Sequence, residues 1–411
     1  MRTSLDKQKI KIVLLEGIHS SAVESFRSDG YTNIGQHAAA LAGAKLRDAV
    51  RDAYFLGIRS ATHLDARFFE EAPRLIGVGC FCIGTNQVDL AAARERGIPV
   101  FNAPFSNTRS VAELVLAEIV MLMRGIPQRN AAAHRGEWIK TAAGSNEVRG
   151  KTLGIVGYGH IGTQVGLLAE ALGMQVLYRD IETRLALGNA RPVPSLEALL
   201  AASDVVTLHV PETAGTQGMI AARQIAAMKR GAKLINASRG TVVDIGALAD
   251  ALRSGQLTGA AIDVFPAEPK GAGQAFESPL RGLENVLLTP HIGGSTAEAQ
   301  QNIGLEVAGK LIKYSNNGSS VGAVNFPEVS LPEHAGKHRL LHIHRNQPGV
   351  LSAINGVFSG EQINIAAQYL NTDVRIGYVV LDVEAGEGVD EMQLKRKLDA
   401  VPGTIRTRIL Y

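Results

Sequence analysis

A glycine motif that follows an apolar run constrains the fold of this chain more than any other feature. Residues 153–156 are apolar, as is typical of a short buried strand, and Gly157-x-Gly159-x-x-Gly162 follows directly. Helical periodicity then begins, and a further apolar run ends on Asp180. This succession of strand, glycine turn, helix and strand, with an acid about 20 residues beyond the motif, predicts a dinucleotide-binding unit.

The three glycines have separate physical roles in such a unit. Gly157 permits the tight turn, Gly159 lets the backbone approach a pyrophosphate, and Gly162 lets the helix pack closely on the strand. The N–H groups at the helix start, near His160 and Ile161, are expected to face the phosphates with the positive end of the helix dipole behind them.

Asp180 closes the unit, where a carboxylate is expected to accept hydrogen bonds from the adenosine ribose. The same carboxylate would repel the 2′-phosphate of NADP, so the sequence predicts NAD as the cofactor. Arg179 beside it is the one residue that tempers this preference. The alternative is a glycine-rich loop with no ligand, and the flanking strands, helix and acid argue against it.

Composition excludes several classes of protein. With 411 residues, 45% hydrophobic and 20% charged, the chain has the composition of a globular protein with two or three domains, and a net charge of +3 gives no reason to expect nucleic acid. No apolar run reaches the ~18 residues of a membrane span, and residues 1–9 lack the apolar segment of a signal peptide. Cys80 and Cys82 are too few for a zinc site or a disulfide framework. We therefore expect a cytoplasmic protein without metal, membrane contact or nucleic-acid partner.

Strands and helices alternate on both sides of the glycine motif, which predicts two doubly wound parallel sheets in an α/β fold. Expected strands before the motif lie at 10–16, at the end of an αβ step over 51–58, at 75–79 and at 100–102. Expected strands from the motif onward lie at 153–156, 175–179, 204–210, 233–237, 260–264 and 285–288. The apolar stretch 111–123, which contains Glu113 and Glu118, predicts an amphipathic helix, and a helix at 296–314 is expected to return to the first domain.

The C-terminal stretch has another element order. Residues 339–411 predict strand, helix, strand, strand, helix, strand, which is the ferredoxin-like βαββαβ arrangement. The sequence thus predicts a discontinuous substrate-binding domain at 1–106 and 295–330, a Rossmann-type NAD domain at 107–294 and a ferredoxin-like domain at 338–411.

Three residues at expected strand ends supply the chemistry that oxidation of a hydroxy acid requires. Arg239 offers a planar fork for a carboxylate, and His291 titrates near neutrality as an acid/base group should. Glu268 is expected to hydrogen-bond the other imidazole nitrogen and favour the protonated ring. Any one of them alone is more often an ordinary polar residue, but all three in one dinucleotide domain favour a catalytic set.

These residues lie in longer motifs that resemble a known family, the D-isomer-specific 2-hydroxyacid dehydrogenases. The matching segments are SNTRSVAE at 106–113, the glycine motif, NASRG at 236–240, AEP at 267–269 and TPHIGGST at 289–296. The resemblance implies catalytic roles for Arg239, Glu268 and His291. It also implies NAD contacts, beyond the glycine motif, His160, Ile161 and Asp180, at Ala237, Ser238, Arg239, Asp263, His291, Ile292, Gly293 and Gly294.

Within the family, the chain is most similar to bacterial members that oxidise D-3-phosphoglycerate and carry a C-terminal ACT domain. Substrate contacts are expected at Arg59, as a partner for a phosphate dianion, and at Asn107, Lys140 and Arg239, with Lys140 reaching from a neighbouring subunit. The alternative for Arg59 is an exposed arginine on a loop. Such members usually have a second arginine where this chain has Ala61. Two other functions stay open: a dehydrogenase for another 2-hydroxy acid such as 2-hydroxyglutarate, and an NAD(H)-sensing scaffold similar to the corepressor members.

The ACT resemblance also implies an effector. In ACT domains, an amino acid binds between paired modules, and the matching residues here are His344, Asn346 and Asn364. L-serine is the effector that the resemblance implies, in a homo-oligomer that we expect to be a tetramer. A domain used only for dimerisation is the alternative, since ferredoxin-like folds have many functions.

Overall fold

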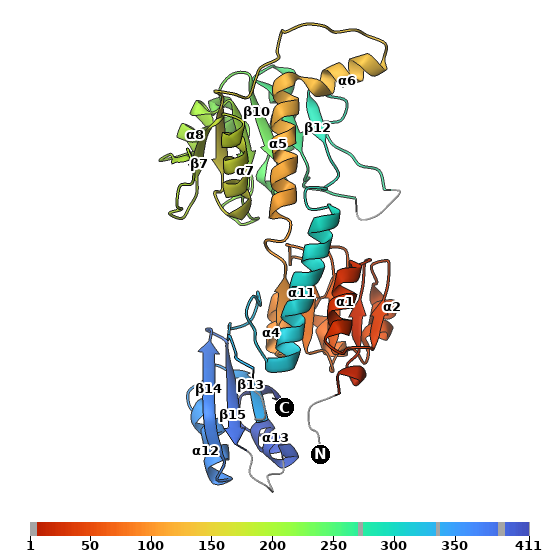
Figure 1. Cartoon of the computed structure of the whole chain (residues 1–411), viewed down its shortest axis with the longest axis vertical. Helices are drawn as coiled ribbons and strands as arrows, with labels where there is room; N and C mark the ends of the chain where they lie inside the picture. Colours follow the sequence, from red (N-terminus) through yellow and green to blue (C-terminus); the bar gives the residue numbers. More distant parts are fainter. Residues whose placement is uncertain (1–5, 270–273, 334–337, 385–390, 411) are drawn as a thin grey trace. The chain divides into compact units, whose positions relative to one another are not determined.

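The computed structural model describes residues 6–269, 274–333, 338–384 and 391–410 (Figure 1). It divides into two compact units, Met1–Ser106 with Gln300–Tyr411 and Asn107–Ala299.

The first part of unit 1 is a five-stranded parallel sheet with strand order β2-β1-β3-β4-β5. Its strands are β1 (Ile12–Leu14), β2 (Ile34–Gln36), β3 (Phe55–Ile58), β4 (Gly77–Cys80) and β5 (Val100–Asn102). Its helices are α1 (Ser20–Ser28), α2 (Gly43–Val50), α3 (Ala66–Glu71) and α4 (Leu90–Glu95), after a short 3₁₀ turn η1 (Lys7–Lys9). All residues of four of these strands are buried, whereas β2, which sequence reasoning missed together with α3, is only partly so. Strand β2 is a short edge strand of sequence Ile-Gly-Gln, which explains why no apolar run marked it.

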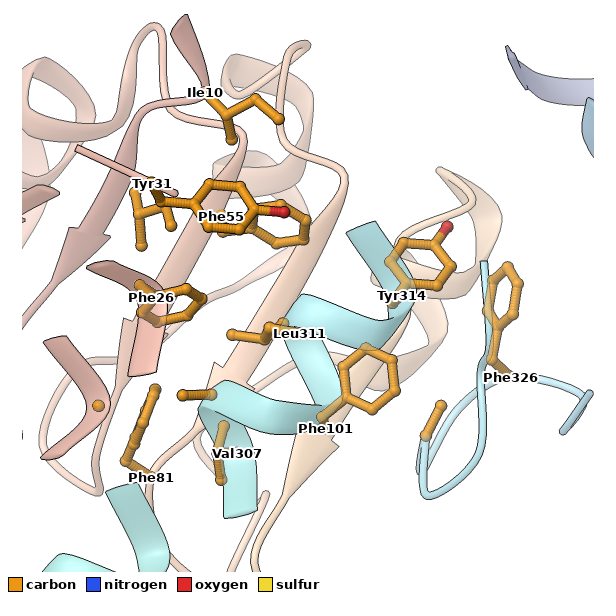
Figure 2. Close-up of a cluster of buried hydrophobic side chains, with 14 of the residues drawn as sticks. Ile10, Phe26, Tyr31, Phe55, Phe81, Phe101, Val307, Leu311, Tyr314 and Phe326 are labelled. Atoms are coloured by element: carbon orange, nitrogen blue, oxygen red, sulfur yellow. The ribbon is translucent and has the colours of Figure 1, made fainter. Parts of the chain in front are cut away.

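Helix α11 (Ala297–Asn317) returns to this sheet from a distant part of the chain (Figure 2). Val307 and Leu311 pack in the same buried cluster as Phe55 and Phe101. Gly79 permits this approach, because a Cβ there would lie 2.7 Å from Val307 Cγ1. The close packing of α11 on β4 explains why the first domain needs a distant segment to complete its core.

The C-terminal sheet of unit 1 is four-stranded and antiparallel, in the order β14-β15-β13-β16 that the ferredoxin-like prediction requires. Its elements are β13 (His338–Arg345), α12 (Val350–Gly360), β14 (Asn364–Thr372), β15 (Ile376–Glu384), α13 (Glu391–Asp399) and β16 (Thr404–Leu410). One face of the sheet shares a core with the two helices, and the other face, which includes Leu341 and Tyr378, belongs to the buried cluster of the first sheet. The two sheets of unit 1 therefore share a hydrophobic core.

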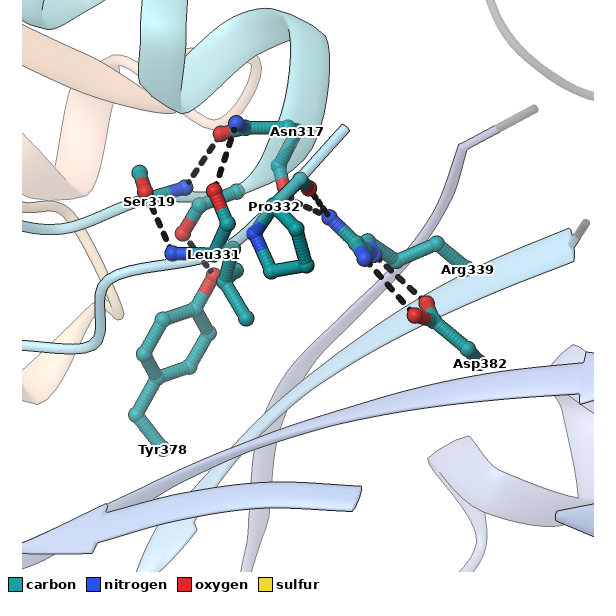
Figure 3. Close-up of polar contacts among 8 residues, drawn as sticks. Asn317, Ser319, Leu331, Pro332, Arg339, Tyr378 and Asp382 are labelled. Carbon is teal, nitrogen blue, oxygen red and sulfur yellow. Dashed lines mark hydrogen bonds and ion pairs between the residues drawn. The ribbon is translucent and has the colours of Figure 1, made fainter. Parts of the chain in front are cut away.

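Polar contacts reinforce this joint (Figure 3). Arg339 is fully buried and donates two hydrogen bonds to Asp382, at 2.6 and 2.7 Å. Its remaining nitrogen donates to the carbonyl oxygens of Asn317 and Pro332, at 3.1 and 2.8 Å. The Tyr378 hydroxyl donates to the carbonyl oxygen of Gly318 at 2.6 Å. The end of α11 and the segment after it are thus bonded to the C-terminal sheet.

Unit 2 contains a seven-stranded parallel sheet with order β12-β11-β10-β9-β6-β7-β8. Its strands are β6 (Thr152–Val156), β7 (Gln175–Arg179), β8 (Arg191–Pro192), β9 (Val205–Leu208), β10 (Ala232–Asn236), β11 (Leu257–Ile262) and β12 (Val286–Leu288). Its helical elements are α5 (Thr108–Arg124), α6 (Ile126–His134), α7 (His160–Ala171), α8 (Leu196–Ala202), α9 (Ala222–Ala227), η2 (Gly240–Val242) and α10 (Ile245–Arg253). Sequence reasoning expected about six strands, and β8 is too short and polar to leave an apolar signal.

Helix α5 departs from the expected polar face. Glu113 is exposed and pairs with Arg109, but Glu118 is only 2% exposed and its carboxylate oxygens have no hydrogen-bond partner in the described chain. Burial, together with the charge of Asp263, raises the pKa of Glu118 to about 8. A carboxylic acid thus replaces an apolar residue inside the unit.

Within the described residues, no helix is both long enough and apolar enough to span a membrane.

Candidate functional site

The glycine turn between β6 and α7 has the shape that a dinucleotide requires. Gly157 has φ +90°, and a Cβ there would lie 2.3 Å from the carbonyl oxygen of His209. A Cβ on Gly162 would lie 2.2 Å from the carbonyl oxygen of Gly157, whereas nothing stands within 4 Å of a Cβ placed on Gly159. The turn is therefore closed on the protein side and open at Gly159. His160 begins α7, with Ile161 next, so the first N–H groups of this helix lie at the turn.

Asp180 lies beside this turn. One carboxylate oxygen accepts a hydrogen bond from the Tyr158 N–H at 2.8 Å, and the other accepts from the Glu182 N–H at 3.0 Å. Arg184 Nε lies 3.6 Å from Asp180 Oδ2, and the Arg184 guanidinium also pairs with Glu182. The acid is thus fixed to the glycine turn, and each oxygen keeps a lone pair for a ribose hydroxyl. These features fit the adenosine and pyrophosphate parts of a dinucleotide.

His291 and Glu268 form the hydrogen bond that the sequence led us to expect. The distance from His291 Nδ1 to Glu268 Oε2 is 2.9 Å, and the Phe265 N–H donates to the other glutamate oxygen at 3.1 Å. The hydrogen bond that the His291 ring donates to Glu268 is the largest influence on the ring and raises the pKa of His291. Burial acts to raise the pKa of Glu268, but the hydrogen bonds from His291 and Phe265 outweigh it and lower that pKa. The arrangement favours an imidazolium held by a carboxylate.

Asp263, just beyond β11, holds the loop that carries this histidine. Its Oδ1 accepts from the Ile292 N–H at 2.8 Å and from the Thr289 hydroxyl at 2.6 Å, and its Oδ2 accepts from the Gly293 N–H at 2.9 Å. His291 itself has φ +54°, a left-handed conformation that is unfavourable for most residues. The aspartate therefore stabilises a strained backbone. Sequence reasoning assigned Asp263 to the cofactor and missed this role.

Arg239 follows β10 in a loop organised by Asn236. The fully buried Asn236 accepts hydrogen bonds from the backbone and hydroxyl of Ser238 and donates to the carbonyl oxygen of Arg239. A Cβ on Gly240 would lie 2.0 Å from the carbonyl carbon of Phe265, so this loop runs against the segment that leads to Glu268. The charge of Arg239 acts to lower the pKa of both His291 and Glu268. Arg239, Glu268 and His291 thus belong to one cluster, with Ala237 and Ser238 at its edge.

His209, at the end of β9, is a further histidine of this unit. Its Nε2 lies 3.0 Å from the Thr207 hydroxyl, and desolvation lowers its pKa to about 3. The ring is therefore neutral at ordinary pH. A group with so low a pKa is a poor proton acceptor, which leaves His291 as the acid/base group of the cluster.

Asn107, at the start of α5, lies beside the histidine loop. It is 9% exposed, and a Cβ on Gly294 would lie 2.4 Å from its side-chain nitrogen. Its side-chain oxygen is buried and has no hydrogen-bond partner in the described chain. Lys140 lies in an exposed segment, next to Trp138 and Ile139, whose side chains are 88% and 48% exposed. The structure groups Asn107 with the histidine loop and shows no contact of Lys140 with it among the described residues.

Arg59 belongs to unit 1, where it follows β3. Glu16 holds this loop, because its carboxylate accepts hydrogen bonds from the backbone N–H groups of Arg59, Ala61 and Thr62 at 2.9–3.1 Å. Gln87 donates to the carbonyl oxygen of Arg59 at 2.6 Å. The backbone under Arg59 is thus fixed, by a glutamate that sequence reasoning placed only in a strand.

The three residues expected at the effector site are not together in one chain. His344 pairs with Gly377, which pairs with Thr372, so His344 and nearby Asn346 lie at one end of the C-terminal sheet. Asn364 pairs with Glu384 at the other end. Eight residues of strand separate these positions, about 27 Å. A site that uses all three requires a second copy of the domain.

Comparison with known proteins gives matches along the whole chain. Residues 116–293 match the model described as D-isomer specific 2-hydroxyacid dehydrogenase, NAD binding domain, and residues 340–406 match the AHAS small subunit-like ACT domain. D-3-phosphoglycerate dehydrogenase of Haemophilus influenzae is 62% identical over 410 residues, which cover 100% of this chain and 99% of that protein. The Escherichia coli (strain K12) protein of the same name is also 62% identical, with 100% of both chains covered.

Solved structures resemble the larger part of the chain. The crystal structure of D-lactate dehydrogenase from Aquifex aeolicus, complexed with NAD and lactic acid, matches with a TM-score of 0.68 and 26% identity. The match covers 77% of this chain and 100% of that one.

Proposed function

The chain belongs to the D-isomer-specific 2-hydroxyacid dehydrogenases, and from this premise we propose that it oxidises D-3-phosphoglycerate to 3-phosphohydroxypyruvate. The chain is an NAD-dependent dehydrogenase, and the relatives that are 62% identical over its whole length are named D-3-phosphoglycerate dehydrogenase. The reaction is the first step of L-serine synthesis. The observation that carries the proposal is the contact between His291 and Glu268, which provides a proton acceptor whose protonated form is stabilised.

The residues of unit 2 divide the reaction among them. When bound on the glycine turn and Asp180, NAD supplies the acceptor for the hydride that leaves the substrate carbon. His291 uses Nδ1 for Glu268, so Nε2 is the atom that takes the hydroxyl proton. Glu268 stabilises the resulting imidazolium, and Arg239 holds the substrate carboxylate through paired hydrogen bonds. His291 must be neutral before oxidation, so the rate should rise with pH through its raised pKa.

Substrate choice rests on residues outside this cluster. Arg59 is proposed to pair with the phosphate, Asn107 to contact the substrate beside the histidine loop, and Lys140 to contribute from a neighbouring subunit. Ala61 leaves Arg59 without the second arginine that such enzymes usually have, which favours a second candidate, a 2-hydroxy acid with a distal carboxylate such as 2-hydroxyglutarate. A single guanidinium binds either anion.

We further propose that L-serine inhibits the enzyme by binding His344 and Asn346 of one chain and Asn364 of another. The separation of these residues along the sheet supports a site made by two copies. A homotetramer in the cytoplasm is the assembly and location that we propose. The three domains expected from the sequence would then serve substrate, cofactor and effector.

Initial rates with D-3-phosphoglycerate and NAD, with and without L-serine, test these proposals. We expect NAD reduction with a kcat/KM for D-3-phosphoglycerate well above that for 2-hydroxyglutarate, and inhibition by L-serine. A higher kcat/KM for 2-hydroxyglutarate would reject the substrate. No turnover with either substrate would favour an NAD(H)-sensing scaffold.

A further inference from the structure

Three arginines from separate segments line one pocket in unit 1. The pocket has a volume of about 320 Å³ and lies between α4 and one end of the C-terminal sheet. Arg94 comes from α4, Arg345 ends β13, and Arg375 lies just before β15. Glu95 is the acid among the lining residues, so positive charge exceeds negative charge on the wall.

The three guanidinium groups differ in what they already bind. Arg94 Nε donates to the carbonyl oxygen of Asn325 at 2.9 Å and lies 3.8 Å from Asp373 Oδ2. Within the described part of the chain, the Arg345 and Arg375 side chains have no hydrogen bond or ion pair. Two guanidinium groups are thus left without a bonded partner in the described chain, beside a third, and an anion would relieve their repulsion.

The backbone beneath these arginines is fixed. Asp373 accepts hydrogen bonds from the N–H groups of Arg375 and Ile376, at 2.7 and 2.8 Å. Asn346 donates from its backbone to Arg375 and from its side chain to Asp373, at 2.9 and 2.7 Å. The Arg345 N–H donates to the carbonyl oxygen of Gly403 at 2.8 Å. A site held in this way loses little backbone freedom when a ligand binds.

From this geometry we propose that the pocket binds a phosphate dianion, either inorganic phosphate or a small phosphomonoester. Guanidinium groups match phosphate oxygens in paired hydrogen bonds, and a volume near 300 Å³ suits a small ligand. A bound phosphate would connect α4 of the first sheet to the C-terminal sheet through Arg94 on one side and Arg345 and Arg375 on the other. The site does not involve His344 or Asn364 but shares Asn346 with the proposed effector site, and it is independent of the proposed reaction.

Calorimetric titration of the full chain tests the proposal. Inorganic phosphate is added at constant ionic strength set with chloride, with glycerol 2-phosphate and succinate as separate arms. Binding of both phosphate compounds supports a phosphomonoester site. Binding of inorganic phosphate alone limits the ligand of the pocket to the free ion. Tighter binding of succinate rejects phosphate as the ligand.

Variants assign the bound phosphate to this pocket. R345Q/R375Q should weaken one phosphate site per chain by at least about tenfold, since two charge-assisted contacts are lost. The matched control R51Q/R223Q removes the same charge from exposed positions elsewhere and should leave binding unchanged. R345K/R375K retains the charge but not the planar fork, and should bind with intermediate affinity even if the glutamine variant folds poorly. Equal phosphate binding by the wild type and a folded R345Q/R375Q chain would overturn the assignment.

Discussion

The Oδ1 atom of Asp263 lies 2.8 Å from the backbone nitrogen of Ile292, the residue that follows His291. The backbone carbonyl of Asp263 also accepts from the His291 N–H at 2.8 Å. One residue at the end of β11 thus fixes the backbone on both sides of the imidazole. Because His291 has a positive φ, these contacts offset a conformational cost of about 1–3 kcal/mol.

Replacing Asp263 with asparagine should reduce kcat/KM by about 10–100-fold while the chain stays folded. The amide keeps one acceptor but presents a donor to an N–H group, which costs roughly 1.5–3 kcal/mol of loop stabilisation. Steady-state kinetics and thermal unfolding measure the two effects. Asp244→Asn is the matched control, because Asp244 also accepts a backbone hydrogen bond but does so at the start of α10. If kcat/KM of Asp263→Asn lies within twofold of the wild-type value, the conformation of the loop that carries His291 does not depend on the Asp263 carboxylate.

Replacing Glu268 with glutamine should move the acid limb of the pH–rate profile for oxidation to lower pH. The hydrogen bond from His291 to the Glu268 carboxylate is the main cause of the raised His291 pKa, and oxidation needs the neutral ring. The maximal rate should also fall, because the imidazolium loses its carboxylate partner. Folding stability has the opposite pH dependence. The pairing of His291 with Glu268 stabilises the fold below the ordinary histidine pKa, and this stabilisation is lost as pH rises through the raised pKa of His291.

The profile of Glu137→Gln, which removes an exposed carboxylate of unit 2, serves as the control for this change. If the acid limb stays in place in Glu268→Gln and disappears in His291→Ala, the imidazole titrates without help from Glu268.

Local sequence pattern predicted the elements whose signal is local. Strands β5 and β7 both have the expected bounds, because each is a mainly apolar run bounded by turn residues. The glycine turn was equally predictable, since each glycine answers a short-range steric need. The contact between His291 and Glu268 followed from the chemistry that the two side chains share.

Other features depend on contacts between distant segments. Glu16 holds the loop at 59–62 only because β1 and β3 are neighbours in the sheet. The core shared by the two sheets of unit 1 pairs β13 and β15 with a helix that ends at Asn317. Glu118 has the polarity of a surface residue, and only the packing of α5 shows it to be buried. No periodicity within one segment carries this information.

Replacing Glu118 with glutamine should flatten the loss of stability between about pH 4.5 and pH 8. The folded-state pKa of about 8 lies above the ordinary value of 4.5. Between these values the unfolded chain loses a proton that the folded chain keeps, so the free energy of unfolding falls by up to about 5 kcal/mol as pH rises toward 8. Urea unfolding at pH 6 and pH 9 measures the difference. Glu113→Gln on the exposed side of α5 is the control, and an equal pH dependence in both variants would contradict the buried acid.

Replacing Ala61 with arginine should lower the KM for D-3-phosphoglycerate by about tenfold. The side chain is exposed and its N–H is already bonded to Glu16, so a guanidinium can be added without disturbing the loop. A second charge-assisted contact to phosphate contributes roughly 1.5–3 kcal/mol. Ala61→Gln controls for side-chain length without charge. An unchanged KM in Ala61→Arg, with a raised KM in Arg59→Gln, would mean that the phosphate lies out of reach of position 61.

Replacing Asp382 with leucine should destabilise the chain by about 3–5 kcal/mol, because Arg339 would remain buried without a counter-charge. Arg339→Met should also be costly, since the carbonyl oxygens of Asn317 and Pro332 lose their donor. The double variant should cost less than the two single changes together, as it removes the buried charge along with its partner. Urea unfolding of the four proteins gives the coupling energy directly. Additive effects would mean that the Arg339–Asp382 ion pair has no coupling energy. The shared hydrophobic core would then be the main contact that stabilises the joint between the two sheets of unit 1.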